Sequence, residues 1–317
     1  MTPLRVRSII WEAEGILAFE LVHPRGERLP AFEAGAHVDV RMPGGISRRY
    51  SLCNRPGETR FWRIAVLQTQ DSRGGSRTMH ERVRAGDLLD VSESHNFFPL
   101  DESAEMSVLL AGGIGITPLL AMVQRLQELG KRFQLHYCTR SPERTAFAQM
   151  LAPLVADGLV RLHHDHGDPK QGLDLRALLQ EHRPGTHLYY CGPAGFMNAV
   201  KEASAHWPRE AVHFEYFGAE PASPTATSAN GVAAELTLSR TGRSIPVQPG
   251  QTLLQALRDA GVECASSCEA GMCGTCEAGH SGGEIEHNDL VLGDDDRRTR
   301  VLVCCARIKR GPVVLDL

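Results

Sequence analysis

The sequence of 317 residues predicts a multidomain protein of mixed β and α/β class. The first observation is a series of short β-like runs between turn residues, up to about residue 103. The second is a change, near residue 105, to apolar runs that alternate with helical patterns. The third is that six of the nine cysteines lie after residue 263. We therefore expect an antiparallel β domain, then a doubly wound parallel-sheet domain, then a small region with a metal site.

Composition and charge exclude several classes of protein. The chain is 42% hydrophobic and 23% charged, which is typical of folded domains. Its net charge is −4 and it has no basic block, so we expect no nucleic-acid partner. The N-terminus does not resemble a signal peptide, and no apolar run of about eighteen residues indicates a membrane span. We expect a cytoplasmic protein with no membrane partner, in which an odd number of cysteines argues against a disulfide framework.

In the first segment, residues 36–45 (AHVDVRMPGG) and 61–68 (FWRIAVLQ) predict strands of an antiparallel barrel or sandwich. Residues 48–52, RRYSL, carry chemistry on such a strand. Arg48 could bind a phosphate, Tyr50 could cover a ring and Ser51 could hydrogen-bond to it. The glycine turn RGGS at 73–76 is a second phosphate-type site. Each motif alone also suits a charged edge strand or a plain loop.

The second segment alternates strands and helices, which predicts a parallel sheet. The expected strands and helices are, in order, a strand at 107–113, a helix at 117–130, a strand at 133–140, a helix at 144–154, a strand at 159–164, a helix at 175–182, a strand at 187–193, a helix at 194–207 and a strand at 212–218.

Two glycine motifs follow strands of this segment. AGGIGITP at 111–118 lacks the third glycine of the dinucleotide fingerprint, but its turn at a helix N-terminus favours a phosphate. CGPAGFM at 191–197 places Cys191 at the end of a parallel strand, where ligands bind in open α/β sheets. A tight turn without a ligand and a buried structural cysteine remain the alternatives for these two motifs.

The third segment follows a Pro/Ser/Thr/Ala-rich stretch at 219–231, which is typical of a linker. Residues 235–248 predict a hairpin, and 252–261 predict a helix that ends at Gly261. The cysteine loop comes next.

The spacing Cys268-x4-Cys273-x2-Cys276, with Cys304 further on, is the plant-type pattern for a [2Fe–2S] cluster held by four thiolates. Gly271 and Gly274 permit a close loop with positive φ angles. A zinc site and a group of buried structural cysteines are the alternatives. A zinc site usually uses two CxxC pairs, and here only Cys273 and Cys276 form one.

Cys304 and Cys305 are adjacent, so the fourth ligand is ambiguous from the sequence. Neighbouring residues of a strand point to opposite faces, and only one of the two would reach the cluster. We expect Cys304 to be the ligand and Cys305 to pack as a small hydrophobic residue. Cys264 is expected to be structural.

In this order along the chain, RRYSLCN, SRGGS, AGGIGITP, HHDHGDP, CGP, HFEYFGA, SSCEAGMCGTC and VLDL resemble the phthalate dioxygenase reductase family, which includes vanillate demethylase reductases. That family lies within the ferredoxin–NADP⁺ reductase superfamily. The resemblance covers essentially the whole chain. It implies an FMN-binding β-barrel at 1–103, an NAD-binding α/β domain at 104–220, a linker at 221–231 and a ferredoxin domain of β-grasp type at 232–317.

The resemblance also implies site residues. Ser51, Cys191 and Phe217 would act at the reacting rings. Nicotinamide-side residues would be Gly113, Cys191, Gly192 and Pro193. FMN contacts would be Arg48, Arg49, Tyr50, Ser51, Ala65, Val66, Gly74, Gly75, Ser76, Thr117 and Phe217.

The family favours NADH over NADPH. Asp165 and Asp168 would oppose a 2′-phosphate, whereas Arg140 would favour one. His163, His164 and His166 are interpreted as strand-end and loop residues rather than as metal ligands.

The implied function is the reductase component of a two-component Rieske-type oxygenase or O-demethylase system. NADH would reduce FMN, and a [2Fe–2S] cluster would pass single electrons to a terminal oxygenase. A stand-alone NADH oxidoreductase for a small acceptor such as a quinone is the alternative, and an iron–sulfur redox sensor is a third class that has no use for flavin and nicotinamide sites. We expect a monomer.

Overall fold

The computed structural model describes residues 1–69, 74–217, 234–266, 271, 274, 276–289 and 292–317. The chain separates into two compact units, Met1–Phe217 and Gly218–Leu317. The ligand calls at Cys268 and Cys273 and the linker at 221–231 lie outside the described residues. The first unit contains both a barrel and a parallel sheet, and the second contains the ferredoxin-type fold.

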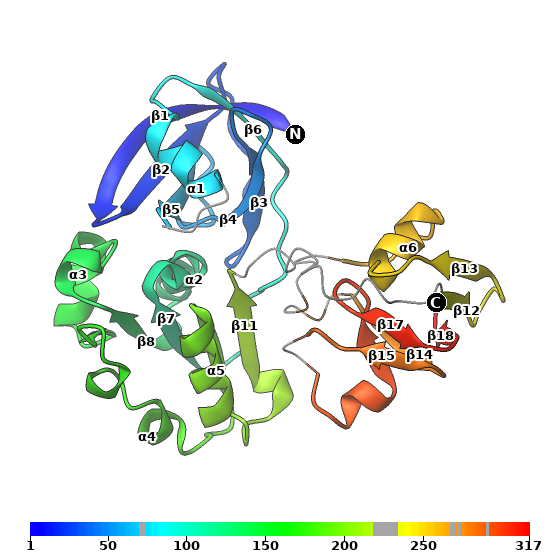
Figure 1. Ribbon diagram of the computed structural model, residues 1–317. Helices are drawn as coiled ribbons and strands as arrows, with labels where there is room; N and C mark the ends of the chain where they lie inside the picture. Colours follow the sequence, from blue (N-terminus) through cyan, green and yellow to red (C-terminus); the bar gives the residue numbers. More distant parts are fainter. Residues whose placement is uncertain (70–73, 218–233, 267–270, 272–273, 275, 290–291) are drawn as a thin grey trace. The chain divides into compact units, whose positions relative to one another are not determined.

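The first unit begins with an antiparallel six-stranded sheet (Figure 1). Its strand order is β4-β3-β6-β1-β2-β5, and the two end strands β4 and β5 approach each other, which curls the sheet into a barrel. Alternating apolar residues fill the interior, because successive side chains of a strand point to opposite faces. The strands are β1 (Thr2–Ala13), β2 (Ile16–Val22), β3 (His37–Arg41), β4 (Ser47–Ser51), β5 (Trp62–Leu67) and β6 (Leu88–Val91).

A parallel five-stranded sheet follows, in the order β11-β10-β7-β8-β9. Leu109 on one face packs with one cluster of apolar residues, and Leu110 on the other face packs with another, so both faces are covered. The doubly wound prediction is confirmed. The strands are β7 (Met106–Gly112), β8 (Arg132–Thr139), β9 (Val160–His164), β10 (Thr186–Gly192) and β11 (Val212–Tyr216); the helices are α2 (Ile116–Glu128), α3 (Ala148–Ala156), α4 (Leu175–Leu179) and α5 (Ala194–Ala203).

Three expected helices differ at their ends. The helix expected from residue 144 begins only at Ala148, because Phe147 adopts a left-handed φ of 60° and Pro142–Arg144 form a 3-10 turn. The helix expected to reach residue 182 ends at Leu179, and that expected to reach 207 ends at Ala203. Conversely, the glycine turn at 73–76 opens a short helix, α1 (Gly75–Glu81), that the sequence pattern did not indicate.

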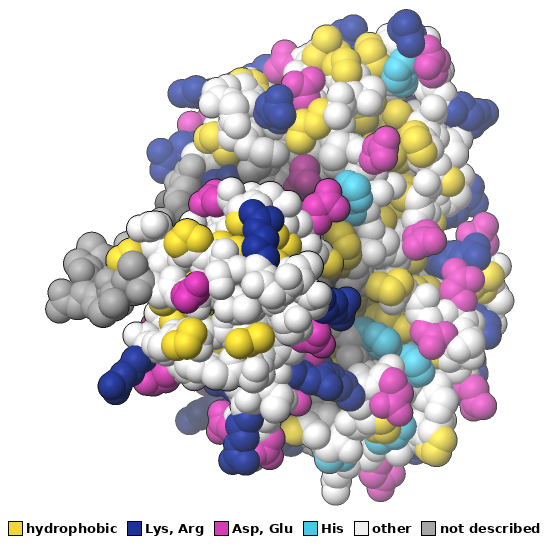
Figure 2. Space-filling model, turned by 90° about the vertical axis from the view of Figure 1, so that its right-hand side faces the viewer, with side chains coloured by type: hydrophobic (Ala, Val, Ile, Leu, Met, Phe, Trp, Pro, Cys, Tyr) yellow, Lys and Arg dark blue, Asp and Glu magenta, His cyan; other side chains and the backbone are white. Residues whose placement is uncertain are grey.

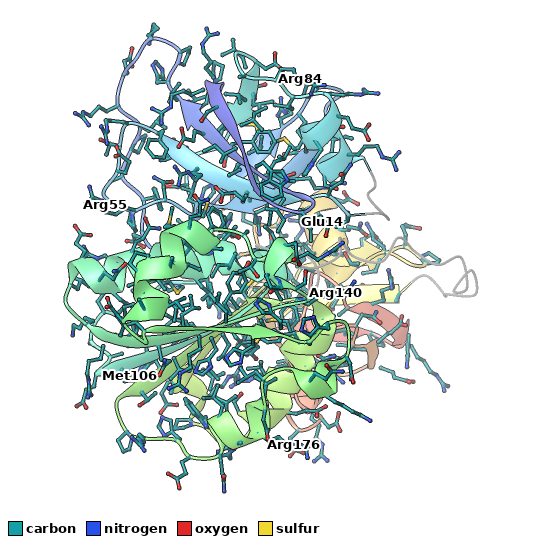
Figure 3. The ribbon with its side chains drawn as sticks, turned by 90° about the vertical axis from the view of Figure 1, so that its left-hand side faces the viewer. Glu14, Arg55, Arg84, Met106, Arg140 and Arg176 are labelled. Carbon is teal, nitrogen blue, oxygen red and sulfur yellow. The ribbon has the colours of Figure 1, made fainter. Side chains whose placement is uncertain are left out.

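The barrel and the parallel sheet share one core. Barrel residues such as Ile16 and Ala65 belong to the same apolar cluster as Leu119 and Leu120 of α2. Gln124 of α2 donates to the carbonyl of Cys53 at 3.0 Å. The carboxylate of Glu14, a residue labelled in Figure 3, lies 3.0 Å from the guanidinium of Arg144. These contacts hold the two sheets as one unit.

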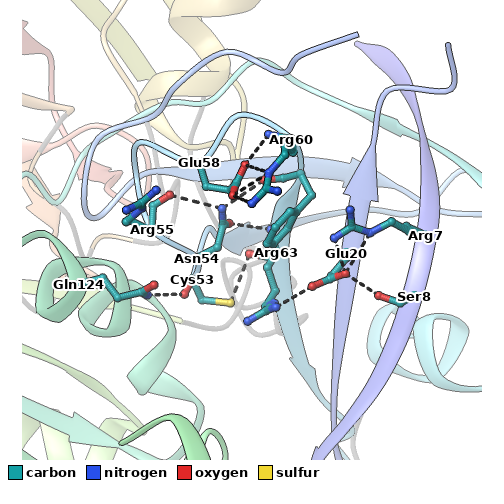
Figure 4. A network of polar contacts seen from close by, with 11 residues as sticks. Arg7, Ser8, Glu20, Cys53, Asn54, Arg55, Glu58, Arg60, Arg63 and Gln124 are labelled. Carbon is teal, nitrogen blue, oxygen red and sulfur yellow. Dashed lines mark hydrogen bonds and ion pairs between the residues drawn. The ribbon is translucent and has the colours of Figure 1, made fainter. Parts of the chain in front are cut away.

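A charged network stiffens the barrel beside this junction (Figure 4). The carboxylate of Glu20, which is only 7% exposed, accepts hydrogen bonds from Arg7 at 2.7 Å, Ser8 at 2.7 Å and Arg63 at 2.6 Å. Burial raises the pKa of Glu20, but these donors outweigh burial and lower it to about 2. The network therefore keeps a buried carboxylate ionised and paired.

The second unit is a mixed five-stranded sheet in the order β13-β12-β18-β14-β16, with a helix packed on its core. Helix α6 (Leu253–Asp259) starts with a capping box between Thr252 and Gln255. This is the expected ferredoxin-type arrangement. Its strands are β12 (Ala234–Leu238), β13 (Ser244–Val247), β14 (Glu277–Ser281), β16 (Arg300–Leu302) and β18 (Val313–Leu315), and β15 (Glu284–Glu286) pairs with β17 (Arg307–Arg310).

Surface charges of both signs are interspersed on the face that Figure 2 shows, and the exposed apolar side chains there form small groups. In the part of the chain that the structure describes, no helix is both long and apolar enough to cross a membrane.

Candidate functional site

Strands β7 and β10 lie side by side at the centre of the parallel sheet, where the chain reverses its direction of winding. Ligands bind at such a switch point, outside the carboxyl ends of the strands. Gly115, in the turn that leads into α2, lies against the carbonyl of Cys191 at the end of β10. A Cβ atom at position 115 would collide with that carbonyl, so only glycine allows this approach.

Two more glycines shape the same edge. A Cβ on Gly112 would lie 3.0 Å from the ring of Phe196, and one on Gly192 would lie 2.7 Å from it. Gly113 has a φ of 53° and open space where a side chain would be. Gly112 and Gly192 thus pack under Phe196, and the open space lies at Gly113, beside the start of α2, where it suits the close approach of a nucleotide.

A residue of the barrel meets this edge. Ser51 is buried, and its hydroxyl donates a hydrogen bond of 3.2 Å to Oε2 of Glu215 on β11. In the sheet register Glu215 is the direct neighbour of Cys191. Three residues that are far apart in the sequence, Ser51, Cys191 and Glu215, thus lie next to one another.

The thiol of Cys191 is completely buried. Burial raises its pKa well above the ordinary value, and the neighbouring Glu215 carboxylate adds to this effect. Cys191 is therefore a neutral thiol rather than a nucleophilic thiolate. It can pack against a ring but is not suited to covalent catalysis.

Arg48 lies over the start of α1. A Cβ at Gly75 would be 2.9 Å from Cγ of Arg48 and 3.0 Å from its Nε, so the arginine side chain passes directly across this glycine. Gly74, which precedes the helix, has a left-handed φ of 98°. The Arg48 guanidinium and the main-chain N–H groups of this glycine turn lie together, and their chemistry fits a phosphate.

The two arginines of the RRYS motif lie on opposite faces of β4, as strand geometry requires. Arg49 is paired in register with Asp39, and its Nε lies 3.7 Å from that carboxylate. Tyr50, on the same face as Arg48, packs against the barrel core, and burial raises its pKa to about 12.

The other predicted flavin contacts are distributed around this region. The hydroxyl of Ser76 lies 3.2 Å from that of Thr69, and the hydroxyl of Thr117 donates to the carbonyl of Ile114 at 3.1 Å. Phe217, at the end of the first unit, is 39% exposed. Ala65 and Val66 are buried on β5, and Pro193 directly precedes α5.

A second group lies at the ends of β8 and β9. The hydroxyl of Thr139 is 2.9 Å from Nδ1 of His164, and Asp165 accepts a hydrogen bond from the N–H of Gly167 at 2.8 Å. His166 has a φ of 49°, in a loop. His163 and His164 thus lie at the end of β9 and His166 lies in a loop, which are the positions expected for them.

In the second unit, two of the four predicted cluster ligands are described, and both are buried. Cys276 is 2% exposed and Cys304 is 4% exposed. The main-chain N–H of Gly271 donates to Sγ of Cys304 at 3.3 Å. Gly271 and Gly274 both have left-handed φ angles, of 69° and 77°. N–H groups aimed at a ligand sulfur are what an iron–sulfur cluster needs, so these residues fit the group.

Cys304 and Cys305 do not lie in a strand, so strand alternation does not distinguish them. Strand β16 ends at Leu302, and both cysteines lie in the following turn. Their hydrogen bonds distinguish them instead. Sγ of Cys305 donates to the carbonyl of Leu302 at 3.5 Å, as a thiol does, whereas Sγ of Cys304 accepts from Gly271. Cys305 packs in the apolar core of this unit, which is the role expected of it.

Residues 288–289 support this turn. Asn288 donates to the carbonyl of Cys305 at 3.2 Å. Asp289, almost fully buried, accepts from the N–H of Leu292 at 2.7 Å. A Cβ on Gly271 would lie 2.9 Å from Cα of Asp289, so the cysteine loop packs directly on this segment.

Glu215 is the residue that sequence reasoning missed. It lies in HFEYFG, which was interpreted as a final strand and as the source of Phe217 only. The available signal was a charged residue in the middle of an apolar parallel strand, which is unusual unless the side chain has a partner.

A cavity of about 610 Å³ lies elsewhere in the first unit and is lined by residues such as Phe32, Asn96 and Arg125. None of the predicted site residues lines it.

Comparison with known proteins places these sites in context. Residues 109–202 match the model of an oxidoreductase NAD-binding domain, and residues 236–309 match that of a 2Fe-2S iron-sulfur cluster binding domain. The reductase subunit of tert-butanol monooxygenase / tert-amyl alcohol desaturase from Aquincola tertiaricarbonis is 45% identical, over 99% of this chain and 95% of its own length. Phthalate dioxygenase reductase from Burkholderia cepacia is 43% identical, over 99% of this chain and 97% of its own.

Tetrachlorobenzoquinone reductase from Sphingobium chlorophenolicum is 39% identical, over 99% of this chain and 97% of its own length. Among solved structures, phthalate dioxygenase reductase, described as a modular structure for electron transfer from pyridine nucleotides to [2Fe-2S], superposes with a TM-score of 0.71. It is 41% identical in sequence, and the match covers 99% of this chain and 97% of that one.

Proposed function

Because this chain belongs to the phthalate dioxygenase reductase family, we propose that the residues around Ser51, Cys191 and Glu215 are its hydride-transfer site and that the turn at Cys304 delivers its electrons. The protein is an NADH-dependent oxidoreductase with FMN and a [2Fe–2S] cluster, and it serves as the reductase of an oxygenase or demethylase system. When bound, these two groups convert a two-electron hydride into single electrons.

The observation that carries the proposal is the meeting of barrel and sheet at the switch point. Ser51 comes from the barrel, whereas Cys191 and Glu215 come from adjacent strands of the parallel sheet. A flavin bound by the barrel and a nicotinamide bound at the strand ends would therefore meet here. Holding two reacting rings face to face is the main way in which such a site accelerates transfer.

Each residue has a role in this arrangement. Arg48 and the start of α1 would hold the flavin phosphate at a distance from the reacting ring. Ser51, held by Glu215, would present its hydroxyl to the ring, and neutral Cys191 would pack against the nicotinamide. Gly113, which has open space where a side chain would be, would leave room for the nucleotide. Phe217 would cover the flavin until the nicotinamide arrives.

The electrons leave through the second unit. Cys268, Cys273, Cys276 and Cys304 would hold the cluster, with the N–H of Gly271 tuning its potential through the Cys304 sulfur. We propose a Rieske-type terminal oxygenase as the acceptor and a monomeric reductase. Its docking contact would be small and transient, as is usual for redox partners.

An anaerobic titration with NADH tests this function, with FMN, iron and sulfide assayed on the same sample. One FMN, two irons and complete bleaching at about 1.5 NADH per chain are expected, because the chain then accepts three electrons. Iron that does not respond to NADH would remove the cluster from the electron path.

A second candidate is a stand-alone quinone reductase, which the 39% identity to tetrachlorobenzoquinone reductase favours. Turnover separates the two. The reductase role requires faster electron transfer to a terminal oxygenase than to free quinones at equal concentration, and the opposite ranking would favour the quinone reductase.

A further inference from the structure

His37, the first residue of β3, is the least explained polar side chain of the first unit. It is 1% exposed, and neither of its ring nitrogens has a hydrogen-bond partner among the described residues. Burying a polar group without a partner costs free energy, so such a group is a candidate for a functional role.

The imidazole faces the carboxylate of the hydride-transfer site. His37 is the cross-strand neighbour of Ser51, so the two side chains lie on the same face of the barrel wall. Ser51 donates to Oε2 of Glu215 at 3.2 Å, and Nδ1 of His37 lies 4.0 Å from Oε1. Two barrel residues thus approach the two oxygens of one carboxylate.

On its other side His37 adjoins an exposed histidine. The main chains of His37 and His95 exchange two hydrogen bonds, of 2.8 Å and 2.9 Å, and their ring centroids are 6.2 Å apart. The ring of Phe97 covers His37 at 5.3 Å. A row of polar side chains therefore runs from buried Ser51 through Glu215 and His37 to His95 at the surface.

Burial keeps His37 neutral. It lowers the pKa of His37 to about 3, and the neighbouring Arg49 and His95 add to this effect. A neutral imidazole has one N–H and one free lone pair, so it can take a proton at one nitrogen and release another from the second.

The reaction requires such a path, because the two electrons and the proton of the hydride leave the site by different routes. NADH loses a hydride, which is two electrons and one proton, and becomes NAD⁺. A one-electron acceptor takes the electrons only, so each NADH leaves one proton in a buried site.

We propose that His37 is a proton carrier that takes this proton from Glu215, which receives it through Ser51, and passes it to His95 and water. The inference rests on the proposed function, since it requires the hydride site to lie at Ser51. The gap of 4.0 Å between His37 and Glu215 exceeds a hydrogen bond, so a small rotation of the carboxylate must accompany each transfer.

The test uses the holoenzyme of the wild type and of the variants His37→Gln and His95→Gln in anaerobic stopped flow. NADH first reduces the protein, and ferricyanide, a one-electron acceptor, then reoxidises it in the presence of a pH-indicator dye. Hydride uptake should change less than twofold in both variants. Reoxidation and proton release should slow about tenfold or more in His37→Gln and less in His95→Gln. Added imidazole should restore part of the rate.

The matched control is His206→Gln, which replaces an exposed histidine after α5 and should behave as the wild type. Exchange gives a readout that does not depend on turnover. In the oxidised holoenzyme with ¹⁵N-labelled histidine, the ring N–H of His37 should exchange with water more slowly once His95 is glutamine, because the exit is then blocked.

The outcomes separate the two proposals. If the wild type fails to reduce ferricyanide with NADH, the proposed function is wrong. If the wild type turns over and His37→Gln releases its proton at the same rate, the carrier role alone is wrong. Should His37→Gln fail to fold, His95→Gln still decides the matter, since an unchanged rate of proton release and of ring N–H exchange in that variant would overturn the route.

Discussion

The two units of this chain build their sites in different ways. In the second unit three of the four predicted iron ligands, Cys268, Cys273 and Cys276, fall within nine residues of the sequence, and the N–H of Gly271 donates to Sγ of Cys304 at 3.3 Å. In the first unit Ser51, Cys191 and Glu215 come from three strands of two sheets. The site of the second unit depends on spacing along the chain, whereas the site of the first unit depends on how a barrel packs against a parallel sheet.

The two sites should respond differently to amino-acid substitutions. A loop that wraps a cluster depends on single sulfur atoms and on glycines that can adopt positive φ angles. A site at a sheet junction depends on the packing of the whole unit, because its residues are placed by strand register and by a shared core. Damage to the loop should therefore be local, and damage to the junction should reduce stability as well.

The largest effect is expected at the cluster turn. Cys304→Ser should reduce bound iron to near zero and stop electron delivery, while NADH still reduces the flavin, because the thiolate is lost and the first unit is intact. Iron content and the electron paramagnetic resonance signal of the reduced protein measure this. Cys305→Ser is the matched control and should keep both, since its sulfur donates to Leu302. The reverse pattern would exchange the two assignments.

The next effect is expected at the junction. Gly115→Ala places a methyl group against the carbonyl of Cys191 and should destabilise the first unit by about 2 to 3 kcal/mol. Thermal release of flavin fluorescence reports on the first unit, and loss of the cluster absorbance reports on the second, which should be unchanged. Gly195→Ala, in open space on α5, should be neutral or slightly stabilising. Equal losses in both variants would contradict the packing argument.

The Glu20 network should make the stability of the first unit depend on pH. The pKa of Glu20 is about 2 in the folded protein, below its ordinary value of 4.5, so its stabilising effect is complete above pH 4.5 and is lost as pH falls toward 2. Glu20→Gln should cost about 2 to 3 kcal/mol at pH 7, because Arg7 and Arg63 lose their carboxylate. Urea unfolding at several pH values measures this. A cost that persists unchanged at pH 2 would show that the charge is not responsible.

The smallest effect is expected at a histidine pair on the parallel sheet. Nδ1 of His136 lies 3.1 Å from Nε2 of His163, and burial lowers the pKa of His136 to about 4. Its stabilising effect is complete above pH 6.5 and is lost as pH falls toward 4, because the unfolded chain binds the proton more readily. At pH 5 the loss should be about 1 to 2 kcal/mol. His136→Gln should remove this part of the acid sensitivity in unfolding experiments, and the exposed His206→Gln should not.

Much of the fold was predictable from patterns of short range. Apolar runs and helical periods located all five strands of the parallel sheet, and the cysteine spacing located the cluster loop. The misplaced helix ends have local causes that composition does not reveal. Phe147 adopts a left-handed conformation that sequence patterns assign to glycine, and α1 is a helix of only seven residues whose first residue is itself a glycine.

The sequence by itself determined the order of the domains, the identity of the cluster motif, the placement of Ser51 on a barrel strand and that of Cys191 at the end of a parallel strand. These features depend on periodicity and spacing, which are properties of neighbours along the chain. Only the tertiary structure decided that Glu215 joins Ser51 to Cys191 and that His37 faces the same carboxylate. Ser51 and His37 each lie more than a hundred positions from Glu215 along the chain, and their contacts with it are set by strand register and by the packing of two sheets, which no local pattern encodes.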